Sequence, residues 1–216
     1  MPTPTRKRPK PREGSREDIL RSACRLFAAH GLENVTFGQI AKAARISRPL
    51  VYFHFKDQRT LFLECVHRAT LELHRRFTTQ IDGKASGLDQ LESMGRAYFQ
   101  LHVDEPDLFQ LLALYEAQPP AEGDTRELYE RIEKLHVEID ELKTGLVRRG
   151  MRDGSIRRDV GDPQRVSTCL WAFSHGLAQL LAVKGTHLCE CLGLDLPKTV
   201  ETGFKLLRTT LTGKRG

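Results

Sequence analysis

The sequence lacks the short motifs that identify several classes of enzyme. It has no glycine-rich loop of the kind that cradles phosphate, no G-x-S-x-G nucleophile motif and no H-E-x-x-H zinc motif. Its histidines and carboxylates are scattered over expected helices without evident pairing. We therefore expect no catalytic residues, no cofactor and no bound metal, and we keep a helical enzyme with a basic tail only as a rival interpretation.

Long apolar runs and sheet-forming runs are also missing. No stretch of 18 apolar residues occurs, so we expect no transmembrane helix and no membrane partner. Residues 1–14 contain no apolar segment of the kind found in secretory signals. No run rich in Val, Ile and Thr alternates apolar with polar residues, which argues against a sheet. A chain of 216 residues with 39% apolar content is still long enough to bury a helical core in one or two domains.

Cysteine is scarce, with five residues and no C-x-x-C pair. Together with the missing secretory signal, this predicts a protein of the reducing cytoplasm. Three cysteines lie on or beside apolar stripes and are expected to be small core residues: Cys24, Cys65 and Cys169. His187, Cys189 and Cys191 form the motif H-L-C-E-C at an expected loop or helix end, and an extended segment would put all three on one side. A metal site or a redox sensor is therefore an alternative to ordinary packing, which we favour because no fourth ligand is evident.

The most informative stretch is TFGQIAKAARISRPLVYFHFKD, residues 36–57. Thr36 and Gln39 have the spacing of a capping box at the start of one short helix. Ser47 is a candidate N-cap for a second short helix, and Arg45 lies in the corner between the two. Polar and aromatic side chains are left on the outer surface of the second helix. This is the helix-turn-helix pattern of DNA-binding proteins.

Flanking residues complete a three-helix unit. A helix that Ser15 can cap is expected to bury Ile19, Ala23 and Phe27 and to end at Gly31 in the left-handed conformation. After the second short helix, apolar residues keep helical spacing from position 61 to position 77. That longer helix is expected to connect the N-terminal unit to the rest of the chain.

Positive charge is concentrated at the N-terminus. Residues 1–55 contain eleven Lys or Arg against four Asp or Glu, a net charge of +7, whereas the remainder has a net charge of −1. This asymmetry indicates a polyanionic partner for the N-terminal part alone. The basic residues among the first fourteen alternate with prolines, so we expect a disordered arm there that contacts DNA. A solvated tail that only aids solubility is the alternative.

Residues 19–62 resemble the TetR/AcrR family of transcriptional regulators. The family pattern is A-x-x-L-F-x-x-x-G, then T-x-x-x-I-A-x-x-A-G-V-S, then an aliphatic residue and Y-x-H/Y-F. The matching positions are Ala23, Leu26, Phe27, Gly31, Thr36, Ile40, Ala41, Ala44, Ile46, Ser47, Val51, Tyr52, His54 and Phe55. Two positions depart from it: Arg45 replaces the corner glycine, and Gln58 stands where a lysine is common, so Lys56 is expected to take over that phosphate contact.

The resemblance implies an all-α fold with three parts. A disordered basic arm (1–14) precedes a helix-turn-helix DNA-binding domain (15–58), and a larger helical ligand-binding and dimerisation domain follows (59–216), with about nine helices. Apolar stripes agree, because they predict helices at 88–103, from Pro106 to before Pro119, at 124–149, at 163–184 and at about 197–212. A polar loop is expected at 152–162, with Asp162 and Pro163 opening the next helix.

DNA contacts are expected from eight residues: Thr36, Lys42, Ser47, Arg48, Leu50, Tyr52, His54 and Lys56. Arg48 suits a guanine or a phosphate, and Leu50 a thymine methyl group. Tyr52 and His54 suit phosphate oxygens, which fix the register of binding without reading sequence. Packing against a neighbouring helix is the alternative for Tyr52 and Phe53.

The resemblance further implies an apolar pocket for an unknown small organic ligand and a homodimer. Candidate ligand contacts are Phe77, Tyr98, His102, Phe109, Tyr115, Trp171 and His175, with plain core packing as the alternative for each. Residues 163–184 are unusually apolar and are expected to be buried on more than one side. Candidate dimer contacts are Val166, Leu170, Phe173, Leu177, Leu180, Val200, Phe204, Leu207 and Leu211.

The function expected from these features is that of a sequence-specific transcriptional regulator. Its partners would be a palindromic double-stranded operator, a small organic ligand and a second copy of itself, and ligand binding would release a repressor from DNA. The rival class is a ligand sensor or carrier with only non-specific DNA binding, which the departures at Arg45 and Gln58 would motivate.

Overall fold

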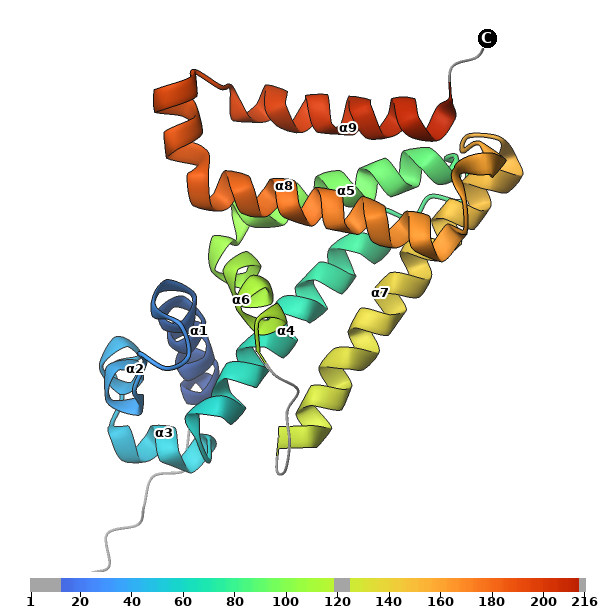
Figure 1. Ribbon diagram of the computed structural model, residues 1–216. Helices are drawn as coiled ribbons and strands as arrows, with labels where there is room; N and C mark the ends of the chain where they lie inside the picture. The colour runs from blue at the N-terminus through green and yellow to red at the C-terminus, as the bar shows by residue number, and fades with distance from the viewer. Residues whose placement is uncertain (1–12, 119–124, 214–216) are drawn as a thin grey trace, which may run out of the picture.

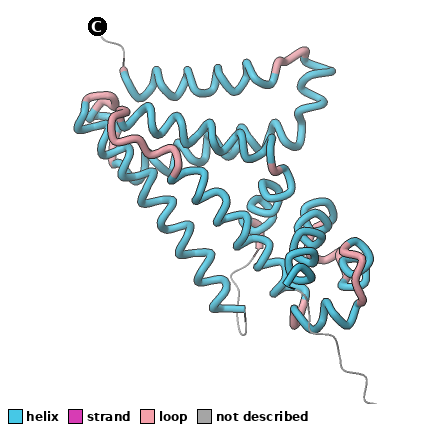
Figure 2. Tube along the Cα trace, turned by 180° about the vertical axis from the view of Figure 1, so that it is seen from behind, coloured by secondary structure: helices cyan, strands magenta, loops and turns pink. Residues whose placement is uncertain are grey.

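The computed structural model describes residues 13–118 and 125–213, so most of the expected basic arm (1–14) and Pro119 lie outside the described residues. Within these ranges the protein is built from nine α-helices and has no strand, which confirms the expected all-α class (Figures 1 and 2). The helices are α1 Glu13–His30, α2 Phe37–Ala43, α3 Arg48–His54, α4 Gln58–Thr78, α5 Gly87–Asp104, α6 Pro106–Glu116, α7 Arg126–Asp153, α8 Pro163–Leu192 and α9 Leu196–Thr212, with a short 3-10 turn at Arg158–Val160.

Helices α1 to α3 form the expected N-terminal unit. α1 begins at Glu13, two residues before the expected cap at Ser15, and Gly31 ends it with a φ of +77°. The capping box of α2 is present: the Thr36 amide donates to Gln39 Oε1 at 2.7 Å, and the Gln39 amide donates to Thr36 Oγ1 at 3.3 Å. Local hydrogen bonding therefore starts α2 where the sequence predicts.

α4 joins the N-terminal unit to the rest of the molecule. It starts at an Asp57 cap, whose carboxylate accepts from the Thr60 amide at 2.7 Å, and runs diagonally across the fold (Figure 1). One continuous apolar core extends from Ile19 in α1 through Leu61 and Phe77 in α4 to the C-terminal helices. The apolar core therefore continues across the expected boundary near residue 58.

α5 and α7 cross at two glycines. A Cβ atom on Gly87 would lie 2.2 Å from the backbone nitrogen of Gly150, and one on Gly150 would lie 2.6 Å from Ile156 Cδ1. α7 continues to Asp153, so the expected polar loop is shorter than predicted, and Ile156 within it is fully buried. The loop is therefore anchored on α7 because Gly150 leaves room for an isoleucine.

α8 begins as predicted, with the Asp162 carboxylate accepting from the Arg165 amide at 3.0 Å, but it ends at Leu192 and so extends beyond residue 184. His187, Cys189 and Cys191 consequently lie on a helix, where residues two apart point about 200° apart. The extended arrangement considered for this motif is wrong. Among the described residues, no group of three His, Cys, Asp or Glu side chains could hold a metal ion.

The outer face of α8 carries exposed apolar side chains, which differs from the expectation of burial on several sides. Phe173, Leu180 and Val183 are 39%, 47% and 67% exposed, and Leu206 on α9 is 59% exposed. By length and composition alone, α8 is long and apolar enough to cross a membrane, although the sequence contains no unbroken run of 18 apolar residues. Of the residues in its most apolar 18-residue window, 22% are buried inside the protein. Within one chain, only one face of α8 is covered.

Candidate nucleic-acid interface and ligand cavities

The corner between α2 and α3 uses an unusual residue. Arg45 has a φ of +55° and is the only non-glycine residue with positive φ among those the structure describes. The Arg45 amide donates to the carbonyl of Lys42 at 3.2 Å, and the Ile46 amide donates to that of Ala41 at 3.0 Å. The corner therefore keeps the left-handed turn of the glycine-containing pattern, at a cost of about 1–2 kcal/mol for a side chain in this conformation.

α3 presents Arg48 and Tyr52 as a pair. Val51 and Phe55 anchor the helix, with 0% and 3% exposure, whereas Tyr52 is 51% exposed. Arg48 Nη2 donates to Tyr52 Oη at 3.1 Å, and its guanidinium carbon lies 5.5 Å from the centre of the tyrosine ring. The Tyr52 ring also packs edge-on against Phe37 at 4.9 Å between centres, so it packs and remains accessible at once.

The other predicted DNA contacts divide into exposed and partly buried positions. Exposed side chains are those of Thr36, Lys42, Ser47 and Lys56, while Leu50 is half-buried. The Ser47 hydroxyl makes no capping bond, although Ser47 is the N-cap of α3. Phe53 is 68% exposed, so the packing alternative considered for it is not what this chain shows.

His54 is the predicted DNA contact that the structure supports least. Its Nε2 atom is buried and without a hydrogen-bond partner. Burial, and then the nearby Arg16 charge, lower the pKa of His54, which favours a neutral imidazole. Gln58, in contrast, has a structural partner, because its side-chain amide donates to the carbonyl of Leu32. The absence of a lysine at position 58 thus reflects a contact that closes the three-helix unit.

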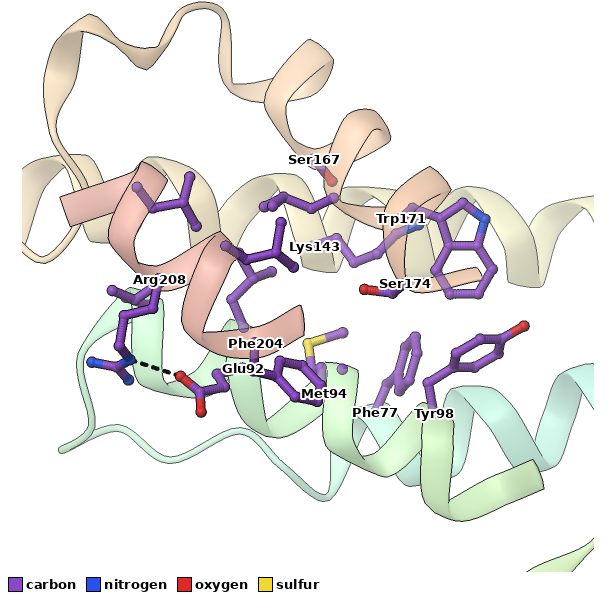
Figure 3. A pocket seen from close by; sticks show the side chains of 16 residues that line it. Phe77, Glu92, Met94, Tyr98, Lys143, Ser167, Trp171, Ser174, Phe204 and Arg208 are labelled. Carbon is purple, nitrogen blue, oxygen red and sulfur yellow. Dashed lines mark hydrogen bonds and ion pairs between the residues drawn. The ribbon is translucent and has the colours of Figure 1, made fainter. Parts of the chain in front are cut away.

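An inner cavity lies between α5, α7, α8 and α9 and has a volume of ≈ 60 Å³ (Figure 3). Its lining residues are Phe77, Leu88, Leu91, Glu92, Met94, Gly95, Tyr98, Lys143, Ser167, Leu170, Trp171, Ser174, Phe204, Leu207, Arg208 and Leu211. The cavity is mostly apolar, with an ion pair at one end, where Arg208 Nε lies 2.8 Å from Glu92 Oε2. Four predicted dimer contacts point here instead: Leu170, Phe204, Leu207 and Leu211.

A larger outer cavity of ≈ 420 Å³ lies on the other side of Tyr98, Lys143 and Trp171, which line both cavities. It is lined by Leu73, Tyr98, Leu112, Tyr115, Glu116, Gln118, Tyr129, Glu133, His136, Ile139, Asp140, Lys143, Thr168 and Trp171. Lys143 Nζ lies 2.7 Å from Asp140 Oδ1 and 4.4 Å from the centre of the Trp171 ring. Burial lowers the pKa of Lys143, an effect that the Asp140 carboxylate partly offsets.

Polar side chains beside the outer cavity are joined by hydrogen bonds across helices. Tyr98 Oη lies 2.8 Å from His175 Nδ1, and His175 Nε2 lies 3.1 Å from Glu116 Oε2. Tyr115 Oη donates to Glu133 Oε1 at 2.7 Å. Burial raises the pKa of Tyr98, so its hydroxyl keeps its proton. This network ties α5, α6, α7 and α8 together around the cavity.

Most of the predicted ligand residues gather at these cavities. Phe77, Tyr98 and Trp171 line the inner cavity, and Tyr115 joins the latter two in the outer cavity. His175 bonds to Tyr98, as described above. Three do not line either cavity: His102, Phe109 and His175. The rings of His102 and Phe109 lie tilted at 4.9 Å between centres, and Phe109 packs against Tyr98 at 5.3 Å.

Sequence reasoning missed the charged residues of the cavities. Lys143 follows Ile139 by four residues and precedes Leu146 by three, so it interrupts the apolar face of α7. A buried lysine at such a position was a signal available in the sequence. Glu116 and Glu133 gave no comparable signal, because each becomes part of the site only through contacts with other helices.

Comparisons with known proteins identify the N-terminal unit first. Residues 19–65 match the family model described as bacterial regulatory proteins, tetR family. The HTH-type transcriptional regulator AcrR of Shigella flexneri is 46% identical over 50 residues, which is 23% of either chain. The HTH-type transcriptional repressor KstR2 of Rhodococcus jostii is 26% identical over 149 residues, covering 69% of this chain and 71% of the relative.

Solved structures share the complete fold at low sequence identity. The transcriptional regulator FadR of Bacillus subtilis, crystallised in complex with stearoyl-CoA, superposes with a TM-score of 0.73 at 17% identity, covering 91% of this chain and 99% of FadR. The MbdR regulator of Azoarcus gives a TM-score of 0.71 at 21% identity, covering 92% and 98% of the two chains. The helix order of the C-terminal part is therefore common to these regulators even where the sequences have diverged.

Proposed function

Because the chain belongs to the tetR family of bacterial regulatory proteins, we propose that it is a transcriptional repressor, released from a palindromic operator by a small organic ligand. The relatives are transcription regulators and not enzymes, and this chain is likewise a DNA-binding regulator. The observation that carries the proposal is α3, which holds Arg48 and Tyr52 on its outer face while Val51 and Phe55 fix it to the core. The name of the KstR2 relative supports repression rather than activation.

On DNA, α3 would enter the major groove as the recognition helix. Arg48 would exchange its bond to Tyr52 for guanine O6 and N7 or for a phosphate, and the Tyr52 hydroxyl would turn to a phosphate oxygen. Ser47, Lys42 and Lys56 would contact the backbone around the helix. The departure at Arg45 does not weaken this proposal, because the corner has the left-handed geometry that the motif requires.

A homodimer would cover the exposed face of α8 and α9. The proposed contacts are the exposed Phe173, Leu180, Val183 and Leu206, together with the half-buried Val166, Leu177 and Val200. Burying one large apolar side chain contributes about 1.5–3 kcal/mol, so a symmetric pair of such faces is enough for stable association. A dimer also explains why α8 is apolar without any need for a membrane, and it supplies the second recognition helix that a palindrome requires.

Ligand binding would act through α4. Its N-terminus follows α3 directly, and its last turns carry Leu73 to the outer cavity and Phe77 to the inner cavity. A ligand that favours a different tilt of α4 must lower DNA affinity by the same coupling factor, typically about 1–3 kcal/mol. The stearoyl-CoA bound by FadR supports an organic ligand in this fold without indicating which one binds here.

The test is selection of bound sequences from a random duplex pool at physiological salt, with the Arg48→Ala, Tyr52→Ala double variant as control. An inverted repeat recovered by the wild type and lost with the variant is the expected result. Equal, weak and sequence-independent binding by both proteins would overturn the proposal and favour a ligand sensor with only non-specific DNA binding. Raising the salt concentration should weaken binding by about 0.9 log units per log unit of salt for each neutralised phosphate.

A further inference from the structure

We propose that the outer cavity binds a lipophilic organic cation, with the aromatic side chains around its body and the carboxylates of Glu116 and Glu133 near its positive charge. This inference rests on the proposed function, in which the cavity is the effector site, and it adds the chemical class of the effector. Its basis is the combination of volume, aromatic lining and a surplus of carboxylates at this one place in the fold.

The first step is the shape and lining of the cavity. A volume of ≈ 420 Å³ suits an organic molecule, whereas the inner cavity of ≈ 60 Å³ is too small for one. Two aromatic pairs line it: Tyr115 and Tyr129, with ring centres 6.1 Å apart, and Tyr98 and Trp171, with ring centres 4.7 Å apart. The faces of such rings attract cations as well as apolar groups.

The second step is the charge of the lining. Lys143 and Asp140 form a pair at 2.7 Å and cancel. The remaining charged side chains are the carboxylates of Glu116 and Glu133, and the remaining titratable neighbours are His136 and His175. Glu133 accepts from the Tyr115 hydroxyl at 2.7 Å and lies 3.5 Å from His136 Nδ1.

The third step is the surplus of carboxylates in the lining. Three carboxylates line the cavity, from Glu116, Glu133 and Asp140, against one ammonium group, from Lys143. Partners on other helices hold the two unpaired with lysine in place: Glu116 Oε2 lies 3.1 Å from His175 Nε2, and Glu133 Oε1 accepts from the Tyr115 hydroxyl at 2.7 Å. A positively charged group entering the cavity would therefore meet two carboxylates that no lysine or arginine of the lining neutralises.

An anionic ligand fits the same cavity poorly. The only lysine in the lining is 7% exposed and already lies between Asp140 and the face of Trp171. An anion would have to displace Asp140 from Lys143 while lying close to the carboxylates of Glu116 and Glu133, and like charges repel. The cavity therefore selects by charge as well as by shape.

The test uses Trp171, the single tryptophan of the chain, whose ring lines the cavity. Its fluorescence is titrated with three probes of similar shape: phenylbutyl trimethylammonium, the neutral analogue in which carbon replaces the nitrogen, and phenylpentanoate. We expect saturable binding of the ammonium compound, with an affinity roughly tenfold or more above that of the neutral analogue. Equal affinity of the charged and neutral probes, or tighter binding of phenylpentanoate, would overturn the inference.

Variants locate the effect on the carboxylates. Glu116→Gln and Glu133→Gln should each weaken the ammonium probe by roughly tenfold and leave the neutral probe unchanged. Glu130→Gln is the matched control, because Glu130 lies on the same helix as Glu133 but pairs with Arg126 at 2.8 Å and does not line the cavity. Loss of ammonium binding in the control to the same extent would contradict the assignment. The comparison of the three probes on the wild-type protein does not depend on any variant folding.

DNA release is measured separately on the operator recovered by selection. Ammonium binding that leaves DNA affinity unchanged would refute ligand release as part of the proposed function while the cation site stands. Specific operator binding by a protein that does not distinguish the three probes would refute the cation site while the DNA-binding function stands.

Discussion

Replacing Gly87 with alanine tests the crossing of α5 and α7, which holds two walls of both cavities together. The added Cβ would lie 2.2 Å from Gly150 N, 2.6 Å from Gly150 Cα and 2.6 Å from the carbonyl oxygen of Leu146. All three are backbone atoms, so no rotamer change relieves the overlap. The helices must separate by about 1 Å before the contacts become normal.

The energetic cost has two parts. Overpacking that shifts backbone typically costs about 1–3 kcal/mol. The same movement strains the hydrogen bond from the Gly87 amide to Asp153 Oδ2 at 2.8 Å and that from the Leu88 amide to Ser155 Oγ at 3.2 Å. Losing a bond of this capping type adds about 0.5–2 kcal/mol. We expect Gly87→Ala to lower the free energy of unfolding by about 2–4 kcal/mol.

The assay is urea unfolding followed by circular dichroism at fixed protein concentration, with Gly145→Ala as the matched control. Gly145 lies within α7, and a Cβ added there would meet nothing within 4 Å. The control should therefore raise stability by about 0.5–1 kcal/mol, because alanine is the better helix former. A Gly87→Ala protein as stable as the wild type, or two variants with equal effects, would refute the reasoning.

Three further predictions concern the dimer, the DNA contact and acid stability. Leu180→Asp, on the exposed face of α8, should convert a dimer to monomers in analytical ultracentrifugation. The control Val103→Asp, at a position 71% exposed on α5, should leave the dimer intact. The reverse pattern would place the interface elsewhere. Arg48→Ala should weaken binding to the selected operator by about 1–3 kcal/mol, with a smaller loss on random DNA. The control Arg126→Ala on α7 should leave the affinity for both DNAs unchanged. Equal losses of affinity on both DNAs would show that Arg48 contacts only phosphate. The pKa of Glu72 is lowered from 4.5 to about 2, first by its bond to Arg75, so its stabilising effect is present above pH 4.5 and is lost as the pH falls toward 2. Glu72→Gln should therefore remove roughly 1–2 kcal/mol of stability at neutral pH, after allowance for solvent screening. It should also flatten the pH dependence of the free energy of unfolding between pH 4.5 and pH 2. The same pH dependence in the variant and the wild type would show that the Glu72–Arg75 pair does not stabilise the fold.

Much of the N-terminal unit was predictable because its determinants are local. The capping box of Thr36 and Gln39, the left-handed end at Gly31 and the buried stripe of α1 all depend on residues within a few positions of one another. Hydrogen-bond geometry and the 3.6-residue period act over that range. The same reasoning located α5, α6 and α9 to within about two residues, but it could not predict how far α7 and α8 continue.

The sequence could not decide which apolar face of a helix meets which neighbour. Phe204 and Leu211 looked like dimer contacts, yet they point into the inner cavity, and Leu206 between them is exposed. Adjacent positions on one helix point in different directions, and only the docking of α9 against α5 and α8 determines which direction is inward. For the same reason, Leu170 and Leu207 belong to the cavity instead of the proposed interface.

By itself, the sequence determined the all-α class, the helix-turn-helix unit and the asymmetry of charge, because short-range spacing and composition are sufficient for each. Tertiary structure alone brought Glu116 of α6 and Glu133 of α7 to one cavity and placed His175 of α8 beside Glu116. These residues are far apart in the chain and show no shared pattern in it. Their proximity follows from the way the helices pack, and that packing depends on the complete set of apolar contacts in the core.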